Sequence, residues 1–485
     1  MSHPFKYLEN RTYEILTSAA ILVFIFSKKH DIRIPYYWDE LGVYVPAAFQ
    51  MKDTGHISLL PGSINPLFSR GHPLLFTFCN ASVFKLFGDS ITVGHLFALF
   101  LAVITLVFFF FLASSIFNKK TAFFSTILLA VQPIFYTLSA QLLPEMLLTF
   151  FTLGCFYGIF NKKWGLFAVF GSLAMLTKES AIVIPATALL LLLISSIRSK
   201  DFFSGSRIKQ YLLAATPLFV FGLFLVIQKI QNGWFLFPEH LGYIHWSIGL
   251  LLRGAWRIFM ELFITQGRAV VGIAFLAGLL ISVLPLKGLI FGKGEKKTFY
   301  IFILFILIAS VFADVNYYLM RYILYLMPFV VMGGTYTVLV LLEKIIPRLI
   351  ALQWILITLF CITGVSFCIK NMSLSPDTCD MSYKLVVNVC KESIHYAEQN
   401  WANDTIEANF PVYQGLQDPR NGYLTGKPIP YSANFVKPTK FGLLFYLWGE
   451  GNIPIGNKIK YHVVKTFDDG YAHVAAVEFE RGDLQ

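Results

Sequence analysis

The feature that most constrains this chain is its succession of apolar runs. About eleven stretches between residues 13 and 369 are long and apolar enough to form helices that cross ~30 Å of hydrocarbon. Hydrophobic residues make up 56% of the chain and charged residues only 14%, against roughly 25% charged residues in soluble domains. These figures exclude disordered, collagen-like and disulfide-scaffold classes. They predict an all-α polytopic membrane protein.

The expected spans are separated by short polar junctions. They are Tyr13 to Ser27, Val93 to Phe117, Thr121 to Ser139, Met146 to Phe160, Trp164 to Thr177, Ala181 to Ile197, Tyr211 to Gln228, Ala269 to Leu286, Thr298 to Ala313, Tyr322 to Leu342 and Leu349 to Ile369.

The net charge of +11 is best explained by topology. Basic clusters recur in alternate junctions, which the positive-inside rule places in the cytoplasm. These clusters are Lys119/Lys120, Lys162/Lys163, Arg198 to Lys209, Lys287 to Lys297 and Lys344/Arg348. The remaining junctions, the loop of residues 28–92 and everything after Ile369 are then expected outside, where Lys28 and Lys29 violate the rule locally.

Two further apolar segments are predicted to lie in the membrane interface. The segment from His72 to Phe87 contains Asn80 and Lys85 and is only ~24 Å long as a helix. If it crossed the membrane, every later basic cluster would change sides. The segment from Trp246 to Phe263 carries a charged stripe at four-residue spacing, which is typical of a surface helix.

The chain changes character after Ile369. Residues 371–485 have ordinary soluble composition, with an amphipathic helix expected from Tyr383 to Asn400 and a β-hairpin about Asp468-Asp469-Gly470. We therefore expect a membrane domain of residues 1–370 and a small soluble α/β domain of residues 371–485. Cys379 and Cys390 could form a disulfide in an oxidising compartment; the sequence leaves this open.

Ionisable side chains on the expected outer face are few enough to weigh singly. They are Asp39, Glu40, His72, Glu145, Lys178, Glu239, His240, Arg253, Arg257 and Arg321. Each has an ordinary explanation: Asp39 as a helix N-cap, Glu145 as a charge favoured by a helix N-terminus, and the arginines as interfacial anchors. None of these explanations accounts for the position of all ten side chains on the same face. Carboxylates beside cations suit a general base that activates an acceptor while a lipid-linked phosphate leaves.

The order of short motifs along these loops resembles one known group of enzymes. From Trp38 to Gly334 the chain carries Trp-Asp-Glu, Arg-Gly-His-Pro, Leu-Pro-Glu, Leu-Thr-Lys-Glu, Phe-Pro-Glu-His and Arg-Tyr-Ile-Leu. This order resembles the GT-C glycosyltransferases. Within them it is nearest to the family 39-like branch of protein O-mannosyltransferases and the aminoarabinose transferase acting on lipid A. The resemblance implies a GT-C fold.

The resemblance also implies roles for particular residues. Asp39 matches the family's catalytic aspartate, the expected general base, and Glu40 is its companion. Glu145 falls where the family usually has a second acidic residue, normally Asp. Lys178 matches the Lys of a Thr-Lys-Gly motif, although Glu179 replaces the glycine. The residues expected to bind the donor phosphate are Lys178, Arg321, His72, Arg253 and Arg257.

A divalent metal is the one cofactor that the resemblance suggests. Glu239-His240 resembles a Glu-His pair whose histidine is associated with a bound metal in the aminoarabinose branch. The glutamate that would partner this histidine corresponds here to Gly71. His240 is thus a candidate metal ligand whose second ligand is unknown, and one histidine does not complete a zinc site.

The expected function is transfer of a sugar from a polyprenyl-phosphate donor to a lipid, glycan or protein acceptor at the outer face of a bacterial cytoplasmic membrane. Asp39 would act as the base and the anomeric carbon would be inverted. The alternative is a transporter or flippase of a lipid-linked sugar, which favours polar sites at mid-membrane and internal repeats. A third reading, a noncatalytic anchor that displays the C-terminal domain, leaves the outer charges unexplained.

Overall fold

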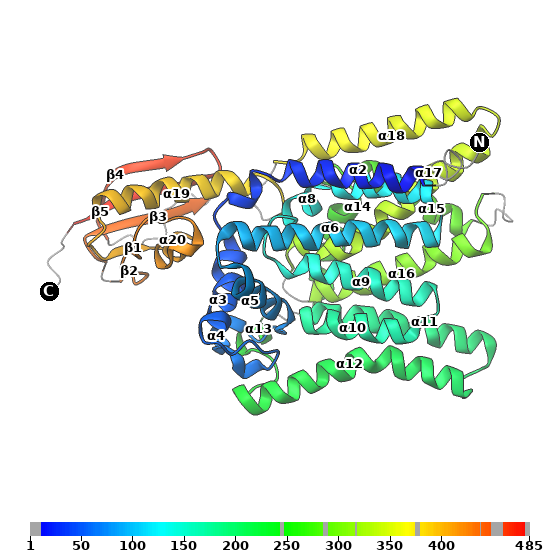
Figure 1. Cartoon of the computed structure of the whole chain (residues 1–485), viewed down its shortest axis with the longest axis horizontal. Helices are drawn as coiled ribbons and strands as arrows, with labels where there is room; N and C mark the ends of the chain where they lie inside the picture. The colour runs from blue at the N-terminus through cyan, green and yellow to red at the C-terminus, as the bar shows by residue number, and fades with distance from the viewer. Residues whose placement is uncertain are drawn as a thin grey trace, which may run out of the picture.

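The computed structural model describes residues 11–242, 247–284, 290–315, 318–373, 379–436, 438–447 and 459–480. Long helices lie side by side along one direction, and a small sheet is attached at one end of the bundle (Figure 1). The bundle helices are α2 (Thr12–Ser27), α6 (Ile91–Ile116), α7 (Lys119–Ala130), α8 (Pro133–Leu138), α9 (Pro144–Phe160), α10 (Trp164–Thr177), α11 (Val183–Ser199), α12 (Gly205–Asn232), α15 (Ala269–Val283), α16 (Lys293–Val315), α17 (Met327–Ile345) and α18 (Ile350–Lys370).

Each predicted span overlaps at least one of these helices. Residues 181–182 and 322–326 form 3-10 helices at the start of two spans, and positions 285 and 286 lie outside the described residues. The predicted span from Thr121 to Ser139 is broken into α7 and α8, because Pro133 cannot continue a helix that precedes it. Within the described residues, six helical stretches are long and apolar enough to cross a membrane: Ile91–Ile116, Glu179–Ser199, Gly205–Asn232, Lys293–Val315, Met320–Ile345 and Ile350–Lys370. The predicted α-helical membrane fold is confirmed.

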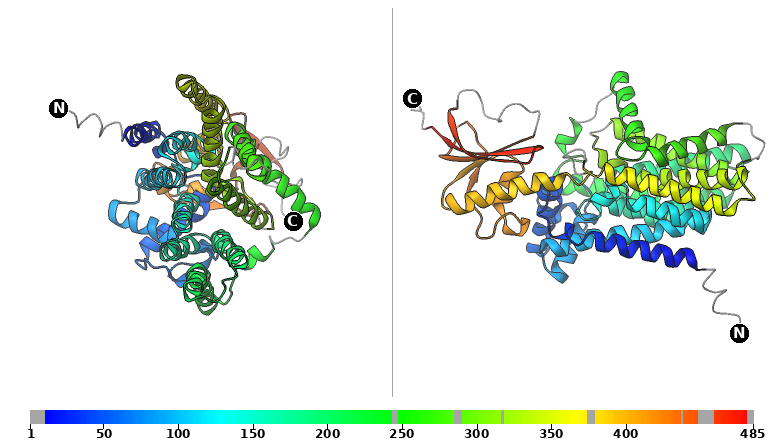
Figure 2. Two further views of the ribbon diagram at one scale, coloured as in Figure 1. Left: turned by 90° about the vertical axis from the view of Figure 1, so that its right-hand side faces the viewer. Right: turned by 90° about the horizontal axis from the view of Figure 1, so that it is seen from above.

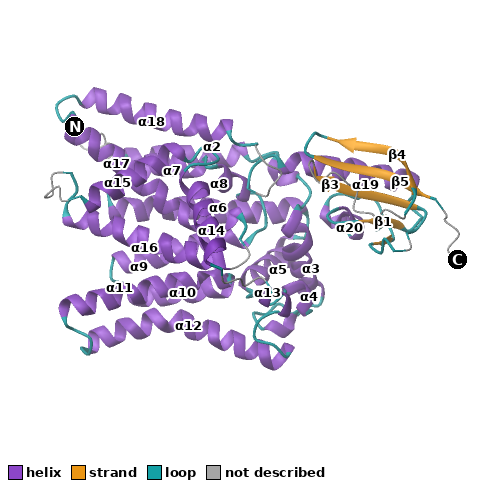
Figure 3. Ribbon diagram, turned by 180° about the vertical axis from the view of Figure 1, so that it is seen from behind, coloured by secondary structure: helices purple, strands orange, loops and turns teal. Residues whose placement is uncertain are grey.

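The described parts of the basic junctions lie at the end of the bundle away from the sheet (Figure 3). Lys119 pairs with Glu14 near the start of α2 at 2.7 Å, and Lys120 pairs with Glu343 near the end of α17 at 3.6 Å. Lys28, at the opposite end, is fully buried, and its Nζ lies 3.0 Å from the Asp31 carboxylate. Lys28 is therefore a packing residue, and its position does not count against the predicted alternation of charge.

Short elements fill the end of the bundle that carries the sheet. They are η1 (Asp31–Arg33), the π-helix η2 (Glu40–Tyr44), α3 (Val45–Asp53), η3 (Pro61–Ser63), α4 (Pro66–Ser69), α5 (Leu75–Phe87), η4 (Glu179–Ile182), α13 (Pro238–Leu241), α14 (Ile248–Phe263) and η5 (Met320–Leu326). The predicted interfacial segments are α5, which packs on α3, and α14, which runs crosswise to the bundle (Figure 2).

The C-terminal region (residues 379–480) is a five-stranded sheet with the order β2-β1-β3-β5-β4. Its elements are α19 (Tyr383–Asn400), β1 (Ile406–Ala408), α20 (Val412–Gln417), η6 (Pro419–Asn421), β2 (Tyr431–Ser432), β3 (Phe441–Leu447), β4 (Tyr461–Asp468) and β5 (Ala472–Phe479). Strands β4 and β5 form the predicted antiparallel hairpin, and α19 confirms the predicted helix. Cys379 and Cys390 are buried, and the structure shows no disulfide between them.

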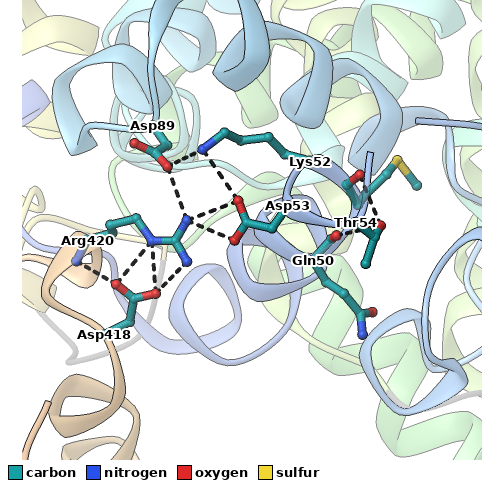
Figure 4. Close-up of polar contacts among 8 residues, drawn as sticks. Gln50, Lys52, Asp53, Thr54, Asp89, Asp418 and Arg420 are labelled. Carbon is teal, nitrogen blue, oxygen red and sulfur yellow. Dashed lines mark hydrogen bonds and ion pairs between the residues drawn. The ribbon is translucent and has the colours of Figure 1, made fainter. Parts of the chain in front are cut away.

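A group of exposed ion pairs joins the C-terminal region to the bundle (Figure 4). The Arg420 guanidinium lies 3.1 Å from Asp53 at the end of α3 and 3.1 Å from Asp89 just before α6. Asp418 binds the same guanidinium at 2.7 Å, and Lys52 pairs with Asp89. We refer to these five residues as the Arg420 cluster. The guanidinium also covers the ring of Phe49 at 4.1 Å.

Candidate active site

Four of the predicted site residues meet at the end of the bundle that carries the sheet: Asp39, Glu145, Lys178 and Arg321. Asp39 directly precedes the π-helix η2, and Glu145 stands in the first turn of α9 because Pro144 begins that helix. Lys178 is extended where α10 ends, and Arg321 belongs to η5. Four segments far apart in the sequence therefore supply one group, which we call the Asp39 cluster.

Opposite charges alternate through the Asp39 cluster. The Glu145 carboxylate accepts from the Lys178 ammonium at 2.6 Å and from the Arg321 Nε at 3.1 Å through the same oxygen, Oε1. A terminal nitrogen of Arg321 forms a close ion pair with Asp39. The ring of Tyr322 lies 3.6 Å from the Lys178 ammonium. Arg321 is therefore shared between two carboxylates.

Burial separates Asp39 from the other three members. The Glu145 and Arg321 side chains are 1% and 2% exposed, whereas the Asp39 side chain is 28% exposed. Burial alone would raise the pKa of Asp39, but the charge and hydrogen bond of Arg321, with the charges of Lys178 and Arg70, outweigh it and lower the pKa. Asp39 is thus an ionised carboxylate that solvent can reach, backed by buried cations.

The ordinary explanation of Asp39 as an N-cap does not hold. Asp39 stands at the N-cap position of η2, yet its side chain accepts no capping hydrogen bond there and turns to Arg321 instead. Glu145 remains in a first helical turn, where a carboxylate is favoured. Its oxygen nevertheless binds two cations from other segments.

Glu40 does not join the cluster, so its predicted part in the chemistry is not supported. Its carboxylate is 1% exposed and binds His95 Nε2 at 2.8 Å. It also accepts from the backbone N–H groups of Leu142 at 2.7 Å and Tyr37 at 3.1 Å. Both oxygens are used within the protein. Glu40 therefore fixes the loop that precedes α9 to the segment that carries Asp39.

His72 lies beside the cluster through a second pair. Its Nδ1 is 3.1 Å from Glu179, the residue that follows Lys178, and its ring centroid is 5.1 Å from that of His240. Gly71 makes this approach possible: its φ of +74° suits glycine, and a Cβ there would lie 2.9 Å from the Cβ of Phe237. The predicted His72 and His240 are thus brought together at the rim.

A metal site at His240 is not supported. Within the described part of the chain, no group of three or more His, Cys, Asp or Glu residues is arranged to hold a metal ion. Burial and the neighbouring charge of His72 lower the pKa of His240, and the ring packs against Phe237 with centroids 5.5 Å apart. The geometry is that of an imidazole packed among other rings.

Arg253 and Arg257 belong to α14, and their predicted role at the donor phosphate stays a prediction. Both side chains are exposed on α14. Arg257 binds Glu261 at 2.9 Å and covers the ring of Tyr318 at 4.9 Å. These contacts belong to the packing of α14 on the bundle.

Sequence reasoning missed His95 and Tyr322. His95 stands near the start of the apolar helix α6 and is 2% exposed, and a buried ionisable group at such a position is itself a signal of a specific partner. Tyr322 was visible as part of the Arg-Tyr pair, yet only the structure shows its ring against Lys178.

Comparisons with known proteins bear on the fold of the chain. The family model for dolichyl-phosphate-mannose-protein mannosyltransferase matches residues 71–234, and no curated protein sequence matches the chain. The crystal structure of ArnT from Cupriavidus metallidurans in the apo state is similar at 13% identity, covering 96% of this chain and 98% of that chain with a TM-score of 0.57.

A second crystal structure of the same ArnT, bound to undecaprenyl phosphate, is similar at 13% identity. The match covers 96% of this chain and 98% of that chain, with a TM-score of 0.55. The predicted resemblance is therefore confirmed, and the chain has the GT-C fold in the form seen in ArnT.

Proposed function

We propose that this protein is a membrane glycosyltransferase that moves a sugar from a polyprenyl-phosphate donor to an acceptor. The family match and the likeness to an ArnT crystallised with undecaprenyl phosphate support this class of donor. One observation carries the proposal: Asp39 is a partly exposed carboxylate paired with the buried Arg321, which Glu145 links to the buried Lys178. A transporter would instead favour polar sites at mid-membrane.

The residues divide the chemistry between them. Asp39 removes a proton from the acceptor while a heteroatom of the acceptor attacks the anomeric carbon of the sugar. The bond between that carbon and the phosphate oxygen breaks on the opposite face of the carbon. The configuration of the carbon is thereby inverted. The departing polyprenyl phosphate keeps the bonding electrons, and Arg321 and Lys178 stabilise its negative charge.

Binding of the donor changes the charge balance around Asp39. Before binding, Asp39 and Glu145 are matched by Lys178 and Arg321. A phosphate that enters beside Arg321 competes for the guanidinium that lowers the pKa of Asp39. Asp39 therefore becomes a stronger base when the donor is in place.

The site is assigned to the outer face of a bacterial cytoplasmic membrane. The basic junctions, including Lys119 and Lys120, lie at the far end of the bundle from Asp39. The positive-inside rule gives that end to the cytoplasm. The C-terminal region and the Asp39 cluster then face outward together.

Replacement of the base tests the proposal. Asp39→Asn removes the charge and the proton acceptor while keeping the shape, so transfer from a purified lipid-linked sugar should fall about 10²–10⁴-fold. Asp53→Asn, in the exposed Arg420 cluster, is the matched control and should stay near wild type. Near-wild-type turnover by Asp39→Asn would contradict the assignment. If the wild-type protein moves the lipid-linked sugar across a vesicle membrane without transferring the sugar to an acceptor, the result would instead support a transporter.

A further inference from the structure

The backbone immediately before Asp39 is strained. Trp38 has a φ of +49°, in the left-handed region that bulky residues rarely adopt. Such a conformation persists only where the surroundings hold it, and it is common at functional sites. The side chains around Trp38 must therefore stabilise its left-handed backbone conformation.

Two aromatic residues of the C-terminal region hold the indole. Phe410 meets it edge-to-face with centroids 4.9 Å apart and an interplanar angle of 80°, and Phe445 lies 6.5 Å away. Asn409 fixes Phe445 by binding both of its backbone groups, at 2.6 and 2.7 Å. Phe410 also packs on the π-helix η2, where a Cβ on Gly42 would lie 3.1 Å from its ring. Phe410 thus contacts the chain on both sides of Asp39.

The C-terminal region also forms hydrogen bonds with the backbone N–H and carbonyl of Tyr36. The N–H of Tyr36 donates to the carbonyl of Asn421 at 3.2 Å. The hydroxyl of Tyr423, a side chain that is 2% exposed, donates to the carbonyl of Tyr36 at 2.8 Å. Residues 34–37 lie between η1 and the helical turn that begins at Trp38, and they belong to no helix or strand. Their conformation therefore depends on these contacts.

The opposite side of Asp39 is fixed to the bundle through Glu40, which binds His95 and the N–H of Leu142. We propose that the C-terminal region is a positioning element of the active site, in which Phe410 and Tyr423 hold the Tyr36–Trp38 backbone so that Asp39 projects toward Arg321. This inference rests on the proposed function, because it gives Asp39 the role of base.

The test uses the full-length protein and a purified polyprenyl-phosphate sugar. Phe410→Leu should lower kcat about 10- to 100-fold, because small misplacements of a reacting group carry costs of this size. The KM for the donor should stay within about twofold, since Lys178 and Arg321 are untouched. Tyr446→Leu is the matched control: it removes the neighbouring aromatic on β3, which stacks on His473 at 4.9 Å, and kcat should be unchanged.

A double-mutant cycle identifies the contact. Trp38→Leu should lower kcat as Phe410→Leu does, Trp38→Phe should recover most of the loss, and the Leu double variant should lose no more than the worse single variant. Gly42→Ala presses on the Phe410 ring from the other side without altering the C-terminal region. Gly42→Ala should lower kcat by a smaller factor than Phe410→Leu, and it tests the same contact if Phe410→Leu fails to fold.

The outcomes separate the two proposals. Wild-type kcat in Phe410→Leu, multiplicative losses in the double variant, or an equal loss in Tyr446→Leu would each overturn the positioning role while leaving the glycosyltransferase intact. A wild-type protein that transfers no sugar from any polyprenyl-phosphate donor would overturn the proposed function itself.

Discussion

The Asp39 cluster and the Arg420 cluster use the same chemistry in different surroundings. Each joins segments that are far apart in the sequence through pairs of carboxylates and cations. In the Asp39 cluster the Glu145, Lys178 and Arg321 side chains are at most 5% exposed, whereas Arg420 is 33% and Asp53 47% exposed. Exposed pairs are weak and screened by salt.

The difference in burial indicates which charged groups can take part in catalysis. In a buried cluster, breaking one pair leaves an uncompensated charge out of water, so geometry is strictly held. A partly exposed member of such a cluster feels strong fields and can still meet a substrate, and Asp39 is that member. Every side chain of the Arg420 cluster is 25–47% exposed, so water screens its charges and its contribution is attachment.

The largest expected effect comes from breaking the buried cluster at its centre. Glu145→Gln leaves Lys178 and Arg321 with one carboxylate between them, and loss of one partner of a buried pair typically costs about 3–5 kcal/mol. We expect a lower midpoint in thermal unfolding of the purified protein and little transfer activity. Glu145→Asp should recover part of both.

The control for that variant is a neighbouring carboxylate. Glu179→Gln removes the partner of His72 at the rim, where the Glu179 side chain is 37% exposed, and should change the unfolding midpoint far less. Equal midpoints for Glu145→Gln and Glu179→Gln would mean that burial does not distinguish the two pairs.

The sequence predicts the membrane part of the fold well because hydrophobic length is a local property. The eleven expected spans fall on helices, and the charged stripe of α14 correctly marks a crosswise helix. The hairpin of β4 and β5 follows from its turn residues in the same way. None of these requires knowledge of tertiary contacts.

The site is predicted only in part because side-chain direction is not local. Asp39 and Glu40 are adjacent and chemically alike, yet one faces Arg321 and the other is closed off against His95, 55 positions away. The order of motifs named Asp39, Glu145, Lys178 and Arg321 within a longer list of site residues, and the structure brings these four together. The order of motifs gave no means of seeing that Arg257 binds Glu261 and covers the ring of Tyr318, since side-chain contacts are set by the fold.

A smaller effect should be visible in the pH dependence of the wild-type enzyme. The acid limb of kcat/KM reports the free enzyme, in which Arg321 and its neighbours lower the pKa of Asp39 below its usual value. The carboxylate is then ionised and active until the pH falls below that range. In the donor complex the phosphate competes for Arg321, so the acid limb of kcat should lie at higher pH than the acid limb of kcat/KM.

Steady-state rates measured from about pH 2 to about pH 8 with saturating and with limiting donor give the two limbs. Coincident limbs would mean that the donor phosphate does not share Arg321 with Asp39. A kcat limb at lower pH than the kcat/KM limb would reverse the proposed sign. Either result would remove the electrostatic link between donor binding and the base.

The smallest effect is expected from the exposed cluster. Arg420→Gln removes the guanidinium that forms three ion pairs (Figure 4), yet exposed pairs contribute only about 0–1 kcal/mol each. We expect a slightly lower unfolding midpoint and kcat within about twofold of wild type, because Phe410 and Tyr423 still hold the segment before Asp39.

Salt sharpens this last comparison. Raising the ionic strength to about 1 M shortens the screening length to about 3 Å, so the difference in unfolding midpoint between wild type and Arg420→Gln should shrink. The corresponding difference for Glu145→Gln should persist, because its charges are buried. If Arg420→Gln lowered kcat as much as Phe410→Leu does, the exposed ion pairs would be as important as the apolar contact with Trp38. Solvent exposure would then not explain why the Asp39 cluster serves catalysis and the Arg420 cluster serves attachment.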